Sequence, residues 1–301
     1  MIKSNPQKYK RLYNARLLPS KLIYLWVILF IAGIISAAWF HSGISGILFF
    51  IGFWGYVISM VVTAIISNKG KTMPGYLRLS FRMNNDFMSD SALDLAIRSY
   101  EKKPCCALAA VISELRRYRG ELTEAEHVLD AAPTRNDRER ISLLCNYAIL
   151  YDITGNYERL ISLEDEADRI ATAHSGDLDI MTSYYRIAET ICKATGQYRL
   201  AKEYYDTVMS VYEKNVSSNA ENTARAVSGY YSFIKGLTLL RKGEIDYLTG
   251  NIPDAAKSMD EAVRLLSPSP FYQDRARSLF MGIQQKCTMN FSQDTQNQEL
   301  R

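Results

Sequence analysis

Residues 143–167 read LLCNYAILYDITGNYERLISLEDEA, and this stretch decides the fold class. Apolar residues recur three and four positions apart before Gly155, which is typical of an amphipathic helix. Glycine readily adopts the left-handed backbone that ends a helix, so we expect the first helix to stop at Gly155. Tyr157 would pack into the hinge, and a second helix would lie close against the first. The stretch therefore predicts a helix–turn–helix unit.

The same pattern occurs four times along the chain. In each copy a residue that is apolar or aromatic follows the glycine by two positions, and a small or apolar residue follows three positions later. The four copies are Gly120-Leu122-Ala125, Gly155-Tyr157-Leu160, Gly196-Tyr198-Ala201 and Gly250-Ile252-Ala255. A degenerate copy with Ala92 but no glycine precedes them. Strand-like alternation is scarce after Pro74, and one helix pair cannot bury its apolar stripe alone, so we expect an all-α stack of repeats.

These copies resemble the tetratricopeptide repeat family, and a generic α-solenoid is the alternative. In the second copy the family's characteristic positions hold Leu144, Tyr147, Ala148, Tyr151, Gly155, Tyr157 and Ala167. Two departures are Leu160, which replaces the small residue of that copy, and the family's Trp position, which never holds Trp. We place the repeat domain at residues 75–290, with a capping helix at 270–290 and a disordered tail at 291–301.

An uncharged region precedes the repeats. From Leu22 to Asn68 the chain has no Lys, Arg, Asp or Glu. Two apolar runs, 22–40 and 47–66, flank a short turn, and each is long enough for a helix to cross a bilayer. We therefore predict a two-helix transmembrane hairpin at 22–68, and a buried hairpin in a water-soluble domain is the alternative.

Basic residues flank both runs, so the positive-inside rule places both termini in the cytoplasm. Residues 1–21 would be a basic cytoplasmic segment of an integral membrane protein that contacts the lipid bilayer through two spans. A bacterial inner (plasma) membrane is the favoured setting. Small residues recur four apart on both runs, and we expect this face to pack the spans on each other or, alternatively, on a partner membrane protein. Its residues are Gly33, Ala37, Gly55, Ser59 and Thr63.

Composition and motifs indicate a binding protein rather than an enzyme. The formal net charge is +4, and residues 1–71 contain no acidic residue, so the positive charge of the chain belongs to this N-terminal segment. The repeats therefore lack the concentrated basic charge that a nucleic-acid partner needs. The five cysteines have no spacing typical of a disulfide framework or a metal site. No phosphate loop, nucleophile elbow or zinc-binding helix motif is present. We expect no catalytic site, no metal and no cofactor.

The family resemblance implies a binding groove lined by the first helix of each pair. Such a groove usually holds a peptide or an extended segment of a partner. Some members hold a partner's C-terminal carboxylate with a fixed Lys and Asn set. Asn146 matches one member of that set, but Ile187 stands at the matching place in the third copy where the set has a basic residue, so that clamp is not expected. Carried over by position, the groove would be lined by Glu114, Arg117, Tyr118, Asn146, Ile149, Asp152, Arg186, Thr190, Lys193 and Tyr247, with Cys145 and Glu244 on the same faces.

The leading hypothesis is a membrane-anchored scaffold or adaptor whose cytoplasmic groove binds partner proteins or peptides. One alternative is an accessory subunit of a membrane transport or envelope-assembly complex, assembled through its spans. A further alternative is a regulator that responds to a peptide or ligand. The partner, the oligomeric state and the register of the last repeat stay open.

Overall fold

The computed structural model describes residues 86–220 and 229–299, together with residue 7 and residues 26–28, 31, 51 and 53–58. Of residues 211–220 and 287–299 it describes the backbone alone. The chain divides into two compact units, residues 7–76 and residues 77–301 with residues 1–6. In the larger unit, the described residues form helices and no strand. The helices are α4 (Asp90–Lys102), α5 (Cys106–Tyr118), α6 (Leu122–Asp130), α7 (Asp137–Thr154), α8 (Tyr157–Ile161), α9 (Glu164–Ala173), α10 (Leu178–Ala194), α11 (Tyr198–Ala220), α12 (Gly229–Leu248), α13 (Ile252–Leu265) and α14 (Pro270–Glu299).

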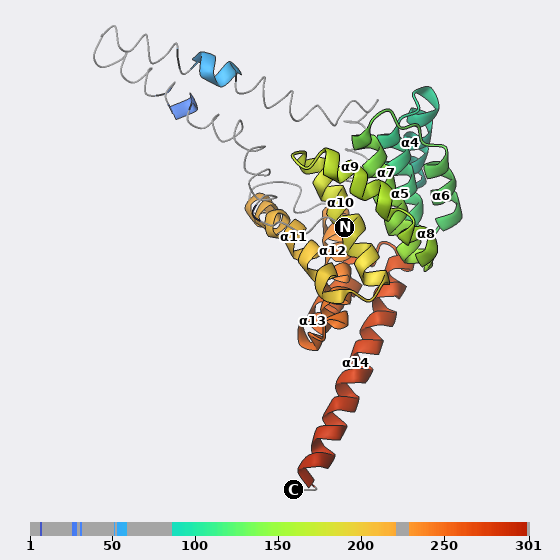
Figure 1. Cartoon of the computed structure of the whole chain (residues 1–301), viewed down its shortest axis with the longest axis vertical. Coiled ribbons are helices and arrows are strands. Elements are labelled where there is room, and N and C mark those ends of the chain that lie inside the picture. The colour runs from blue at the N-terminus through green and yellow to red at the C-terminus, as the bar shows by residue number, and fades with distance from the viewer. Residues whose placement is uncertain are drawn as a thin grey trace, which may run out of the picture. The chain divides into compact units, whose positions relative to one another are not determined.

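Four helical hairpins form the body of this unit (Figure 1). They pair α5 with α6, α7 with α8 and α9, α10 with α11, and α12 with α13. Each hairpin turns at one of the glycines that the sequence pattern indicates. The φ angles are 80° at Gly120, 69° at Gly155, 76° at Gly196 and 85° at Gly250. The predicted left-handed hinges are therefore confirmed.

The close-contact position after each hinge is fully buried. Ala125 and Ala255 are 0% exposed and Ala201 is 1% exposed, so these second helices lie directly against the first. Leu160 is also 0% exposed, although it is larger. In this copy the second helix is interrupted after Ile161 and resumes at Glu164. The interruption occurs in the copy whose close-contact residue is not small.

The segment predicted to cap the repeats forms part of α14, which packs on α13 and α12. Ala276 and Ile283 are buried on the packed side. The helix is longer than expected, since it continues to Glu299 and extends away from the repeats (Figure 1). The segment predicted as a disordered tail, residues 291–301, is therefore helical as far as Glu299.

The last hairpin returns to the first, which the repeat pattern did not predict. The ring of Phe271 lies against Gly120, where an added Cβ would be 3.2 Å from the Phe271 Cδ2 atom. Phe233 on α12 contacts Tyr118 on α5, with ring centroids 4.8 Å apart. Phe87 lies 4.8 Å from Phe233, also between centroids. This buried aromatic cluster joins the two ends of the repeat series.

The helices that the structure describes contradict the predicted transmembrane hairpin. Across the described residues, no helix combines the length and the apolar character that crossing a bilayer requires. Within 22–40 and 47–66 the structure describes residues 26–28, 31, 51 and 53–58. The rest of both runs lies outside the described residues. The predictions of an integral-membrane localisation and of two cytoplasmic termini depended on this hairpin, and they are contradicted with it.

The predicted face of small residues falls mostly in the same region. Gly33, Ala37, Ser59 and Thr63 lie outside the described residues. Gly55 is described, and the indole of Trp26 lies directly against it, in the space that a Cβ would fill. Here a small residue allows the close approach of an aromatic side chain.

Candidate functional site

The first helices of the four hairpins, together with α14, surround a cavity of about 270 Å³, which we call the central cavity. A smaller space of about 80 Å³, the adjoining pocket, shares four of its lining residues and reaches toward Arg275 on α14. The central cavity is lined by Ala110, Val111, Glu114, Arg117, Tyr118, Ser142, Cys145, Asn146, Ile149, Ser183, Arg186, Leu237 and Tyr272.

The structure brings together nine of the ten residues predicted to line the groove. Six line the central cavity, namely Glu114, Arg117, Tyr118, Asn146, Ile149 and Arg186. Asp152, Thr190 and Lys193 line the adjoining pocket. The tenth, Tyr247, lies elsewhere, since its ring is covered by the Lys286 ammonium group at 4.6 Å from the ring centroid. Tyr247 stands almost at the end of α12, near the hinge.

Sequence reasoning missed part of the lining. Tyr272 and Arg275 come from α14, which the pattern assigned to capping alone. Leu237 and Arg241 lie on α12, seven and three residues before Glu244. That helical spacing places them on the face of Glu244, so the periodicity of α12 was the signal that could have identified them.

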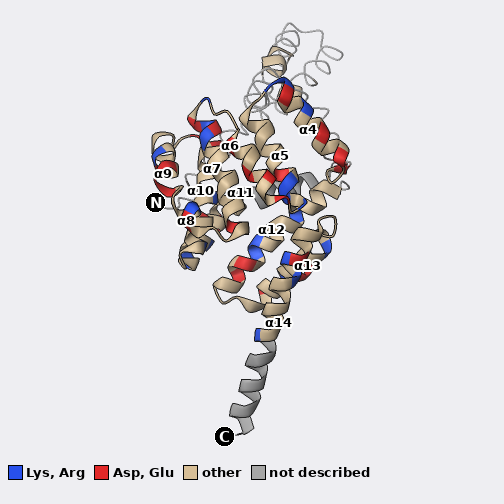
Figure 2. Ribbon diagram, turned by 90° about the vertical axis from the view of Figure 1, so that its right-hand side faces the viewer, with Lys and Arg blue, Asp and Glu red and all other residues tan. Residues whose placement is uncertain are grey.

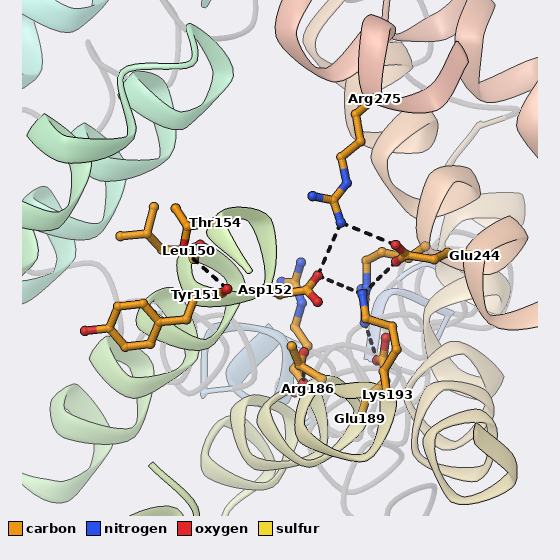
Figure 3. Close-up of polar contacts among 11 residues, drawn as sticks. Leu150, Tyr151, Asp152, Thr154, Arg186, Glu189, Lys193, Glu244 and Arg275 are labelled. Carbon is orange, nitrogen blue, oxygen red and sulfur yellow. Dashed lines mark hydrogen bonds and ion pairs between the residues drawn. The ribbon is translucent and has the colours of Figure 1, made fainter. Parts of the chain in front are cut away.

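Four charged side chains from four helices meet in the adjoining pocket (Figure 3). The Lys193 ammonium group lies 2.7 Å from Asp152 Oδ2 and 2.7 Å from Glu244 Oε2. The Arg275 guanidinium group lies 3.3 Å from Glu244 and 3.6 Å from Asp152. These side chains are at most 25% exposed, so solvent screens their attraction less than at the surface. The cluster therefore ties α7, α10, α12 and α14 together.

The pKa values of this cluster favour its charged form. Burial opposes ionisation of Glu244, but Lys193 and Arg275 outweigh burial and hold the pKa of Glu244 below its usual range. Burial also opposes the charge on Lys193, but Glu244 and Asp152 outweigh it and raise the Lys193 pKa. The two cations and the two carboxylates therefore neutralise each other inside the protein.

A second ion pair joins α10 to α12. The Arg241 guanidinium group donates to the Glu189 carboxylate and lies over the ring of Tyr205, 5.5 Å from its centroid. Glu189 is buried. Burial lowers the pKa of Arg241, but Glu189 outweighs it, so the net shift is upward. The positive charge of Arg241 is therefore neutralised by Glu189.

Arg117 and Arg186 differ from the other cations of the site. Arg117 is 4% exposed, and its Nη2 atom donates to the neutral Asn146 Oδ1 atom at 2.9 Å. Its Nε–H group has no acceptor. For the Arg186 guanidinium group, the described residues provide neither a hydrogen bond nor an ion pair. Burial, and then the nearby charge of Arg241, lower the pKa of Arg186.

One carboxylate, Glu114, lies in the same part of the cavity. It accepts a hydrogen bond from the hydroxyl of Tyr118. Asn146 is also held in place, because its amide nitrogen donates to the Ser142 carbonyl at 2.9 Å while its oxygen receives Arg117. Figure 2 shows that basic and acidic residues occur next to each other on the helices of this unit. The central cavity thus presents two cations and one anion. Asn146 on α7 holds Arg117, and Tyr118 holds Glu114 within α5.

The cavity does not offer an activated thiol. Cys145 is buried, and burial raises the pKa of its thiol, whereas a nucleophilic cysteine needs a lowered value. Over the described part of the chain, no group of His, Cys, Asp and Glu side chains is arranged to hold a metal ion. The arrangement is suited to hydrogen bonding and ion pairing with a bound group.

Comparisons with known proteins add no assignment to this geometry. No protein-family model, curated protein or solved structure matches the chain. The fold and site define a class, an α-helical repeat domain with a concave site, while membership of the tetratricopeptide repeat family stays a prediction.

Proposed function

We propose that the protein is a binding module that holds part of a partner protein or peptide in its central cavity. The observation that carries this proposal is the pair of guanidinium groups, Arg117 and Arg186, on the cavity wall. Arg117 is buried and Arg186 is partly buried. Removing a cation from water without a charged partner is costly, so a fold that retains two such cations gains when a ligand pairs with them. A concave site with a few convergent polar groups is the usual form of a ligand site.

The proposal favours binding over catalysis. Lys193 and Arg275 are neutralised by Asp152 and Glu244, and the Cys145 sulfur that lines the central cavity belongs to a thiol with a raised pKa. The size of the cavity also limits the occupant. About 270 Å³ lies just below the usual range of small-ligand sites, so the cavity takes the end of a chain or a few atoms of a side chain.

A cavity-filling variant tests the proposal. Peptides selected from a random-sequence library against the full-length protein would be titrated against the wild type, Ala110→Phe and Ala107→Phe. Ala110 lines the cavity, whereas Ala107 is exposed on the same helix and is the matched control. We expect Ala110→Phe to abolish binding with an unchanged circular dichroism spectrum, and Ala107→Phe to bind as the wild type. Equal affinity of both variants would overturn the proposal.

A further inference from the structure

We infer that Arg117 and Arg186 form a carboxylate-binding site in the central cavity. This inference rests on the proposed binding function and names the chemical group that the cavity takes. The site differs from the Lys and Asn set of the tetratricopeptide family, because both of its cations are arginines, from α5 and α10. Guanidinium groups offer paired N–H donors that match the two oxygens of a carboxylate.

The charge balance of the lining selects a singly charged anion. Lys193 and Arg275 are matched by Asp152 and Glu244, as described above. Arg241 is matched by Glu189. Arg117, Arg186 and Glu114 remain among the charged residues that line the two spaces, which leaves a surplus of one positive charge. A carboxylate cancels this surplus, whereas a doubly charged phosphate would leave an excess of negative charge.

The donors are held ready for such a ligand. Arg117 is buried and is fixed on one side by Asn146, and its Nε–H group is the donor without an acceptor. The Nε–H group of Arg186 is likewise buried without an acceptor. Donors that are already desolvated and oriented gain more from an incoming acceptor than donors that must first lose water and order themselves.

The other residues of the cavity wall indicate the chemical character of the remainder of the ligand. Val111, Ile149 and Leu237 are aliphatic, and the ring of Tyr272 completes this side. A ligand that places its carboxylate on the arginines would therefore put a short apolar group against these residues. Two sources have this chemistry: a free short-chain acid, and the carboxyl terminus of a peptide that ends in an aliphatic residue.

The test compares acids with their neutral amides on the full-length wild-type protein. The probes are 4-methylpentanoate against 4-methylpentanamide, and N-acetylleucine against N-acetylleucinamide, with inorganic phosphate as a further anion at constant ionic strength. Binding is followed by the nitrogen-15 resonances of the arginine Nε–H groups. We expect each acid that binds to exceed its amide by about tenfold or more in affinity, and phosphate to bind more weakly than the acids. Equal affinity of acid and amide, or preferential binding of phosphate, would overturn the inference without any variant being made.

Substitutions then locate the site. Arg117→Gln and Arg186→Gln should each lower acid affinity about tenfold or more and leave the weak amide binding unchanged. Arg98→Gln, at an exposed arginine of α4, is the control and should change nothing. Without ligand, Arg186→Gln should also raise the unfolding midpoint by about 2–4 °C, because it removes a partly buried charge that has no ion-pair partner among the described residues. A lowered midpoint together with unchanged acid binding would show a purely structural role and overturn the inference.

The two probe families separate the sources and the two proposals. Tighter binding of N-acetylleucine than of 4-methylpentanoate would identify a peptide terminus, and the reverse order would identify a free acid. Acid binding without any library peptide binding would support the carboxylate site and refute the peptide-binding function. Peptide binding that is insensitive to both arginines and to C-terminal amidation would refute the carboxylate site alone.

Discussion

The hydroxyl of Ser269 donates a hydrogen bond to the backbone carbonyl of Tyr118, which stands 151 residues earlier in the chain. Ser269 precedes α14 and Tyr118 is the last residue of α5, and both are buried. The contact joins the end of the repeat series to its beginning. Because Tyr118 and Tyr272 both line the central cavity, this junction also determines how far the cavity is closed.

Replacing Ser269 with alanine should destabilise the protein. The change leaves the buried Tyr118 carbonyl without this donor and also removes the oxygen that accepts from the Tyr272 amide. We expect the free energy of unfolding to fall by about 1–3 kcal/mol in urea titrations. Ser278→Ala is the control, since its hydroxyl bonds only to the Asp274 carbonyl of the same helix and is exposed. An equal loss of unfolding free energy in the two variants would contradict the inference that the Ser269–Tyr118 contact stabilises the protein.

The hinge glycines should differ in their tolerance of alanine. Gly155 and Gly120 both have positive φ, so alanine at either is expected to cost about 1–2 kcal/mol of backbone strain. At Gly155 no atom lies within 4 Å of an added Cβ, whereas at Gly120 the Phe271 ring does. Gly120→Ala should therefore lower the free energy of unfolding more than Gly155→Ala does. A double variant with Phe271→Ala should remove this excess, and an excess that persists would show that the ring contact is not its cause.

The ion cluster predicts that the free energy of unfolding depends on pH in the acidic range. The pKa of Glu244 is lower in the folded protein than in the unfolded chain, so its stabilising effect is complete above about pH 4.3 and is lost as the pH falls through the folded value. Glu244→Gln should lower the free energy of unfolding at pH 7 by about 1.5–3 kcal/mol. Between pH 5 and pH 3 the difference from the wild type should shrink. The measurement is urea unfolding at several pH values.

The exposed carboxylate Glu158 provides the control for this prediction. Glu158→Gln should follow the wild-type profile, because its side chain takes no part in the cluster. A difference between wild type and Glu244→Gln that stays constant down to pH 3 would mean that the Glu244 carboxylate is not stabilised by Lys193 and Arg275.

Local chemistry explains what the sequence could predict. The four hinges were predictable because a left-handed turn selects glycine at one position, and the predicted positions all have positive φ. The groove lining was carried over by position from the resemblance to the tetratricopeptide repeat family, and α5, α7 and α10 carry the nine predicted residues that meet in the two spaces. Both inferences depend on neighbours within one hairpin.

What the sequence did not predict depends on contacts between distant parts of the chain. The return of Phe271 to Gly120 follows from the summed rotation of successive hairpins, which no single repeat encodes. For the same reason Tyr272 and Arg275 were not expected in the site. The membrane prediction was based on the length and apolar character of two runs alone, and no helix among the described residues has both properties.

The last prediction concerns the close-contact position of two consecutive hairpins, Leu160 and Ala201. Leu160→Ala should lower the free energy of unfolding by about 2–5 kcal/mol, since Leu160 is fully buried and its loss leaves a cavity. Ala201→Leu should lower it by about 1–3 kcal/mol, because the added carbons have no room between α10 and α11. Urea unfolding of both variants measures these losses. Loss in both would show that each hairpin is packed for its own residue, whereas a neutral Leu160→Ala would mean that the interrupted helix α8–α9 can close to the spacing of the other copies.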